Sequence, residues 1–144
     1  MTIAEESKLN FEDVSCLIID DDKFSRTMIK TALSQIGVKQ ILDADGFANA
    51  SNLIKQHKLD VILLDQEIPT MNGTEIAQKI RNGDVDPNKK DIPIVMVTID
   101  VKESTVLEAK KLNIQEYLIK PISPIALKKR LHSAIGIKKP KVDE

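Results

Sequence analysis

The sequence predicts an α/β domain in which five β-strands alternate with five α-helices, a (βα)₅ arrangement with a doubly wound parallel five-stranded sheet. Five short apolar runs, rich in β-branched residues, are typical of strands buried on both faces; they cover residues 15–19, 40–44, 60–64, 93–97 and 116–119. The segments between them carry apolar residues at helical spacing. This alternation favours an open parallel sheet with helices on both faces.

The five predicted helices each present an apolar stripe. In the first, the stripe consists of Met28, Ile29, Ala32, Leu33 and Ile36, and Gly37 ends the helix. The next three helices cover about residues 47–56, 73–81 and 102–112. The last helix begins with Ser123 as its N-cap and Pro124 at its first helical position.

Size and composition favour one domain. The chain has 144 residues, and a domain of that size buries roughly 70% of its unfolded surface. We expect a polar N-terminal extension over residues 1–13, the domain over 14–135 and a flexible basic tail over 136–144. A net charge of −1 gives no argument for a nucleic-acid partner, and no apolar run is long enough for a membrane span. A single cysteine, Cys16, and the absence of a secretory signal indicate a cytoplasmic protein.

Polar residues follow four of the predicted strands at their carboxyl ends. The first strand is followed by Asp20, Asp21 and Asp22, the third by Asp65, the fourth by Thr98 and the fifth by Lys120. In an open parallel sheet these ends share one edge, where ligand sites form. If the strand order is 2-1-3-4-5, the first and third strands are neighbours, and the acidic triplet lies beside Asp65.

The chemistry of this edge points to phosphoryl transfer. Several carboxylates within a few ångströms repel one another unless a cation is present, and Mg²⁺ prefers oxygen ligands. Lys120 adds a fixed positive charge and Thr98 a hydroxyl donor. Together with a carboxylate that can attack phosphorus, these groups could bind and stabilise a phosphoryl group.

Five motifs resemble those of the response-regulator receiver domain of two-component signalling. In chain order they are LIIDDD at 17–22, VILLDQEIP at 61–69, MNG at 71–73, VMVT at 95–98 and YLIKP at 117–121. The resemblance covers about residues 14–135 and implies a flavodoxin-like sheet of order 2-1-3-4-5. Each motif alone is weak evidence for this family, whereas the ordered set with these spacings is strong evidence.

The resemblance implies a phosphoacceptor and its cation. Asp65 would accept the phosphoryl group. Asp21 and Asp65 would ligate Mg²⁺ (or Mn²⁺) directly, Asp20 would act mostly through water, and the backbone carbonyl of Glu67 would complete the protein ligands.

Further roles follow from the same resemblance. Lys120 would pair with the phosphoryl oxygens, and its peptide bond to Pro121 would be cis. Thr98 would bond to a phosphoryl oxygen, and Tyr117 would change rotamer in step. The residue after Thr98 is usually small in this family but is Ile99 here, which predicts slower hydrolysis of the acyl phosphate.

The implied function is that of a single-domain response regulator, which is a switch and not an enzyme beyond its own phosphorylation and dephosphorylation. The phosphoryl donor would be a sensor histidine kinase or a phosphotransfer protein. Phosphorylation would change partner binding at the face formed by the fourth helix, the fifth strand and the fifth helix. The partner would be a downstream protein or a second copy of the chain. The sequence leaves open which kinase, output partner and pathway are involved, and whether the chain is an end point or a relay.

Two alternatives remain at this point. A haloacid-dehalogenase-like phosphohydrolase would use Asp20 as its nucleophile, but Phe24 stands where that class has Thr or Val, and no cap domain is evident. A receiver-like interaction module that is never phosphorylated would share the fold. The complete acidic set, Thr98 and Lys120 speak against that module, because an inactive site need not retain them.

Overall fold

A computed structural model describes residues 10–136 and contains one five-stranded sheet. Its strands are β1 (Ser15–Ile19), β2 (Gln40–Ala44), β3 (Val61–Asp65), β4 (Ile94–Thr98) and β5 (Glu116–Ile119). All neighbours are parallel, in the order β2-β1-β3-β4-β5. The predicted (βα)₅ sheet and its strand order are therefore confirmed. Most of the predicted N-terminal extension and basic tail, residues 1–9 and 137–144, lies outside the described range.

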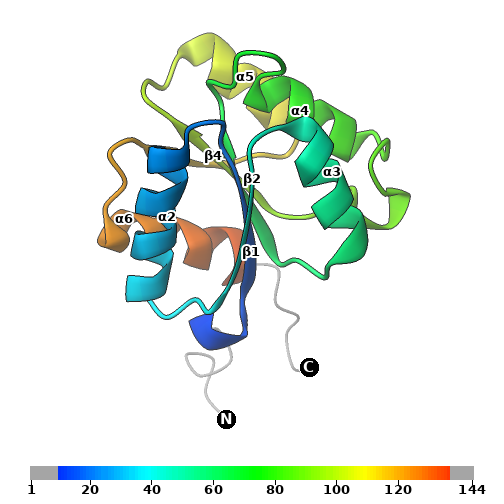
Figure 1. Cartoon of the computed structure of the whole chain (residues 1–144). Coiled ribbons are helices and arrows are strands. Elements are labelled where there is room, and N and C mark those ends of the chain that lie inside the picture. Colours follow the sequence, from blue (N-terminus) through cyan, green and yellow to red (C-terminus); the bar gives the residue numbers. More distant parts are fainter. Residues whose placement is uncertain (1–9, 137–144) are drawn as a thin grey trace, which may run out of the picture.

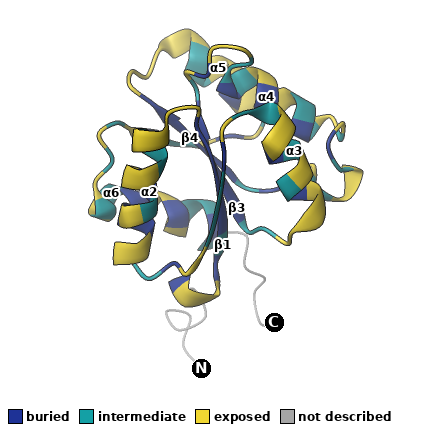
Figure 2. Ribbon diagram, viewed as in Figure 1, coloured by how far each residue is buried: buried dark blue, intermediate teal, exposed yellow. Residues whose placement is uncertain are grey.

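Two layers of helices cover the sheet (Figure 1). Helices α2 (Lys23–Gln35) and α6 (Pro124–Leu131) lie on one face, and α3 (Phe47–Gln56), α4 (Gly73–Arg81) and α5 (Glu103–Lys111) lie on the other. Successive strand side chains point to opposite faces, so each strand contributes to two cores. Leu17, Ile62 and Met96 pack on the α3–α5 side, whereas Ile18, Leu63 and Val95 pack on the α2–α6 side. Burial on both faces explains the continuous apolar runs and the buried centre of Figure 2.

Helices α2, α4 and α6 begin where side chains satisfy free backbone amides, whereas α3 and α5 begin without a side-chain cap. Asp22 accepts a hydrogen bond from the Ser25 amide at the start of α2 (3.0 Å), and Ser123 accepts one from the Ala126 amide at the start of α6 (3.1 Å). Asn72 and Glu75 form a reciprocal capping box at the start of α4. The cap predicted at Ser123 is confirmed.

Short helical turns complete the chain: η1 (Phe11–Asp13), η2 (Pro87–Lys89) and the π-helical turn η3 (His132–Gly136). Phe11 is buried and joins the α2–α6 core, so packing begins before β1. None of the helices within residues 10–136 is both long and apolar enough to cross a membrane.

Three details differ from the sequence prediction. Strands β3 and β4 lie one residue later than expected, because Asp65 pairs with Val97 and Thr98 pairs with Ile119 in the ladders. Met28, predicted to lie on the buried stripe of α2, is exposed. A helix turns about 100° per residue, and the buried stripe is centred on Ile29 and Leu33, so Met28 falls outside it.

Candidate functional site

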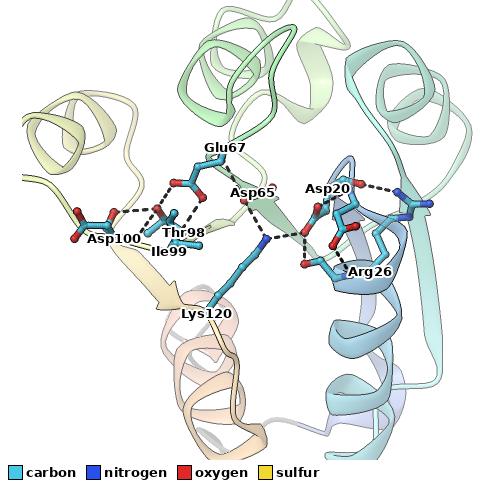
Figure 3. Close-up of polar contacts among 10 residues, drawn as sticks. Asp20, Arg26, Asp65, Glu67, Thr98, Ile99, Asp100 and Lys120 are labelled. Atoms are coloured by element: carbon cyan, nitrogen blue, oxygen red, sulfur yellow. Dashed lines mark hydrogen bonds and ion pairs between the residues drawn. The ribbon is translucent and has the colours of Figure 1, made fainter.

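The polar residues at the carboxyl ends of the strands converge at one edge of the sheet. Asp20 directly follows β1, Asp65 ends β3, Thr98 ends β4 and Lys120 directly follows β5. The side chain of Lys120 extends between two carboxylates, with Nζ 3.0 Å from Asp20 Oδ2 and 3.4 Å from Asp65 Oδ1 (Figure 3). Residues 100 positions apart therefore meet in one cluster.

Asp20 is fully buried, and both of its carboxylate oxygens are hydrogen-bonded. Oδ1 accepts from the Asp22 amide (2.9 Å), and Oδ2 accepts from Ser25 Oγ (2.5 Å) and from Lys120. A buried carboxylate is tolerated only when such partners replace its water. Asp20 is therefore a fixed negative charge at the base of the site.

The second buried carboxylate, Asp65, is less well satisfied. Its Oδ1 accepts a long hydrogen bond from the Glu67 amide (3.3 Å) and faces Lys120. Burial, and then the charge of Asp20, raise the pKa of Asp65 from 3.8 to about 6, while Lys120 and the Glu67 amide oppose this rise. Burial alone would lower the pKa of Lys120, but its hydrogen bond to Asp20 and the two carboxylate charges outweigh burial and raise it. The ionised form of Asp65 is thus costly without further positive charge.

Three carboxylates, those of Asp20, Asp21 and Asp65, offer oxygen ligands to a cation that could supply this positive charge. Ligand atoms of Asp20, Asp21 and Asp65 all lie within 4.8 Å of one another. The donor set consists only of oxygen, and Asp21 is exposed, which leaves the cluster open to water on one side. A hard cation such as Mg²⁺, which retains water ligands, fits this donor set.

On the other side of Asp65, the carboxylate of Glu67 covers the end of β4. Its Oε2 accepts a short hydrogen bond from Thr98 Oγ1, and its Oε1 accepts one from the Ile99 amide (3.3 Å). Thr98 Oγ1 also lies 2.9 Å from the carbonyl oxygen of Asp100 and 3.2 Å from its amide nitrogen. Asp100 therefore meets Thr98 through its backbone, and Glu67 holds the hydroxyl that was predicted to bind a phosphoryl group (Figure 3).

The loop after Asp65 is shaped by a close backbone approach at Gly73. A Cβ atom there would lie 2.6 Å from the carbonyl oxygen of Asp65 and 2.9 Å from Gln66 Cα, so a larger residue would force the backbone apart. Gln66 Oε1 also accepts from the amide and hydroxyl of Thr74 (3.0 and 2.9 Å), at the start of α4. These contacts fix the loop that carries Glu67.

Comparison with known proteins identifies this arrangement. The sequence model of one protein family, the response regulator receiver domain, matches residues 16–132. The chain belongs to this family. This receiver domain is 32% identical over 121 residues to the chemotaxis protein CheY homolog of Campylobacter jejuni, covering 83% of this chain and 91% of that protein. Its identity to chemotaxis protein CheY1 of Helicobacter pylori is also 32%, covering 83% and 95% of the two chains.

The solved structures agree with this assignment. The receiver domain superposes on chemotaxis protein CheY4 of Vibrio cholerae with a TM-score of 0.76 at 26% identity, covering 84% of this chain and 98% of that one. Membership of this family disfavours the phosphohydrolase, which would use Asp20 as its nucleophile. The hydrogen bonds to both Asp20 oxygens fit a fixed charge better than an attacking group.

The resemblance assigned a rotamer change to Tyr117 and a cis peptide bond to Lys120 and Pro121. Tyr117 is half-buried, and its hydroxyl donates to the Val106 carbonyl in α5 (3.4 Å), so its ring spans the gap between β5 and α5. The peptide bond between Lys120 and Pro121 is cis, as predicted. The structure thus brings Asp20, Asp65 and Lys120 into contact, and connects Thr98 to them through Glu67.

Two residues around Asp20 were missed from the sequence. Ser25 holds a carboxylate oxygen, and Arg26 Nη1 donates to the backbone carbonyl of Asp20 (2.7 Å). Helical spacing offered a partial signal, because Arg26 lies one turn after the N-cap Asp22 and so near the acidic triplet. Its backbone partner carries no signature in the sequence.

Proposed function

We propose that this receiver domain is a phosphorylation switch that accepts a phosphoryl group on Asp65 from a phosphohistidine. The observation that carries the proposal is the position of Lys120, whose Nζ contacts both Asp20 and Asp65 at the open edge of the sheet. There it can pair with Asp65 before transfer and with phosphoryl oxygens afterwards.

In the proposed transfer, the phosphoryl group passes from the imidazole of the donor histidine to Asp65. An oxygen of Asp65 attacks the phosphorus atom, a P–O bond forms, the P–N bond to the donor imidazole breaks, and the electron pair leaves with the imidazole nitrogen. Asp21 and Asp65 would hold Mg²⁺ (or Mn²⁺) directly, Asp20 mostly through water, and the Glu67 carbonyl would complete the set. When bound, the cation supplies positive charge that offsets carboxylate repulsion and the charge of the phosphoryl oxygens.

Switching would begin at Thr98. Its hydroxyl carries one hydrogen, which cannot serve the Glu67 carboxylate and a phosphoryl oxygen at once. A phosphoryl group on Asp65 would draw this hydroxyl away from Glu67. Tyr117 would then change its rotamer and leave its present hydrogen bond to the Val106 carbonyl in α5. The two arrangements form a bistable element that phosphorylation biases.

The proposed output surface is the face formed by α5, β5 and α6. Each of these elements carries an exposed apolar side chain: Leu107 in α5, Ile119 in β5 and Ile125 in α6. Such residues are typical of protein contact surfaces. The proposed partners are a sensor histidine kinase or phosphotransfer protein as donor, and a downstream protein or a second copy of the chain as target. The relatives named above make a component of a chemotaxis pathway the first class of target to test.

The decisive experiment is incubation with Mg²⁺ and acetyl phosphate, followed by mass spectrometry of the modified peptide. A gain of one phosphate on Asp65, lost in Asp65→Asn and without Mg²⁺, supports the switch. Phosphate on Asp20 would support the hydrolase, and no modification by acetyl phosphate or by a histidine phosphodonor would support an unphosphorylated module. Beryllofluoride with amide chemical-shift mapping tests the conformational part, which predicts shifts around Thr98 and Tyr117.

A further inference from the structure

In the acidic loop, which consists of Asp20, Asp21 and Asp22, a backbone carbonyl accepts a hydrogen bond from an arginine side chain. Arg26 Nη1 donates to the carbonyl oxygen of Asp20 over 2.7 Å, while the Asp20 amide donates to the Ala44 carbonyl (3.0 Å). The Asp20 carbonyl belongs to the peptide unit between Asp20 and Asp21. Because a peptide unit is planar, fixing its oxygen also fixes the direction in which the chain enters Asp21.

Arg26 is itself anchored from the neighbouring strand. Its Nε lies 2.9 Å from Asp43 Oδ2 in β2, and the arginine side chain is only 16% exposed. The two nitrogen atoms of one rigid guanidinium thus bridge a carboxylate on β2 and a carbonyl after β1. Lys30 also contacts Asp43 (Nζ to Oδ1, 3.1 Å), but it has no hydrogen bond to the acidic loop.

Asp21 needs such external positioning. Within residues 10–136, no side-chain hydrogen bond holds its carboxylate, whereas the carboxylate of Asp20 is held at both oxygens. The orientation of Asp21 therefore depends on its backbone. Arg26 holds the peptide unit before it, and the amide of the peptide unit after it, that of Asp22, donates to Asp20 Oδ1.

We infer that Arg26 is a positioning residue for the cation site: held by Asp43, it sets the peptide plane between Asp20 and Asp21 and so aims the Asp21 carboxylate at the cluster. The inference rests on the proposed function, because it concerns the cation expected there. Residues that orient metal ligands typically change metal affinity by about 10- to 100-fold when they are replaced.

Charge alone predicts the opposite sign. Arg26 is a cation near a cation site, so removing its charge should strengthen Mg²⁺ binding by reducing repulsion. If Arg26 acts by positioning, its loss should weaken binding despite that gain. Lys30 provides the matched control, since it carries the same charge and contacts the same Asp43.

The test is a Mg²⁺ titration of the full chain in which the amide chemical shifts of Asp21 and Asp22 report binding. It is carried out on wild type, Arg26→Gln, Arg26→Lys and Lys30→Gln. We expect affinity to fall roughly 10- to 100-fold in Arg26→Gln and to stay within about twofold in Lys30→Gln. Arg26→Lys keeps the charge, but a single ammonium group cannot reproduce the two-nitrogen bridge, so its affinity should fall between these two. Phosphoryl uptake at saturating Mg²⁺ should recover in every variant, because only the cation requirement changes.

Mg²⁺ binding by Arg26→Gln as tight as by Lys30→Gln would overturn the inference. So would wild-type affinity in Arg26→Lys, which also serves if Arg26→Gln does not fold. A wild-type chain whose Asp21 and Asp22 amides ignore Mg²⁺ would instead overturn the proposed cation site, so the two failures are distinguishable.

Discussion

Replacing Asp65 by Asn should stabilise the metal-free protein at neutral pH. The Asp65 side chain is 3% exposed, and burial together with the charge of Asp20 raises its pKa from 3.8 to about 6. A carboxyl group whose pKa is raised by folding costs nothing below its unfolded pKa and destabilises the fold progressively as pH rises through the folded pKa. The shift of about 2 pKa units corresponds to about 3 kcal/mol above pH 7.

The substitution keeps the local contacts that do not depend on charge. An asparagine Oδ1 can still accept from the Glu67 amide, and Lys120 retains Asp20 at 3.0 Å. Urea unfolding in chelator at pH 7.5 should therefore show Asp65→Asn more stable by about 3 kcal/mol. At pH 4.5 the difference should shrink to about 1 kcal/mol, because the wild-type carboxyl is then mostly protonated in the folded state.

Asp21→Asn is the matched control, because it removes a carboxylate from the same cluster at an exposed position. It should change metal-free stability by less than about 1 kcal/mol. Adding Mg²⁺ at about ten times its dissociation constant should stabilise wild type by about 1.4 kcal/mol and both variants by less. Equal stability of wild type and Asp65→Asn at pH 7.5, or a difference that does not change with pH, would refute the electrostatic reasoning.

Three further substitutions test the site from other sides. Ile99→Ala should shorten the lifetime of the phosphorylated protein by roughly threefold or more, measured as released phosphate, because a 66% exposed side chain next to Thr98 no longer shields the acyl phosphate; equal lifetimes would remove this idea. Glu67→Gln should speed uptake from acetyl phosphate roughly fivefold, about 1 kcal/mol, by removing a negative charge and loosening Thr98; slower uptake would contradict it. Gly73→Ala should destabilise the protein by about 1–3 kcal/mol in urea, because its Cβ would meet the Asp65 backbone; wild-type stability would contradict that clash.

The fold was predictable because burial on both faces of the sheet leaves a direct trace in the sequence. Val61 and the three residues after it are all buried, and no surface helix or exposed strand needs such an unbroken apolar run. The cluster was predictable for a related reason. A carboxylate that directly ends such a run, as Asp20 and Asp65 do, lies next to the buried strand, and partners from neighbouring strand ends must offset the free-energy cost of burying it.

The contacts that were missed depend on loop geometry and on backbone partners. The carboxylate of Glu67 reaches Thr98 from the loop that follows Asp65, and the contacts of Gln66 with Gly73 and Thr74 hold that loop in place. These contacts do not follow from the spacing of apolar residues. Arg26 bonds to a carbonyl, a group that every residue carries, so the sequence cannot identify its partner. Side-chain identity predicted which chemistry gathers at this edge, whereas the orientation of each group required coordinates.

The contacts of Glu67 would connect the proposed phosphoacceptor, Asp65, to the proposed switch at Thr98. Burial and the charge of Asp20 are the main causes that raise the pKa of Asp65, and the Glu67 carboxylate adds to them. The same carboxylate accepts hydrogen bonds from Thr98 and the Ile99 amide, so it acts on both Asp65 and the donors expected to bind a phosphoryl group there. A phosphoryl group on Asp65 would bring oxygen acceptors of like charge beside this carboxylate. Glu67 would then be repelled while Thr98 finds a new acceptor, and both effects favour the same movement. The unphosphorylated arrangement is therefore held by contacts that the phosphoryl group itself would replace.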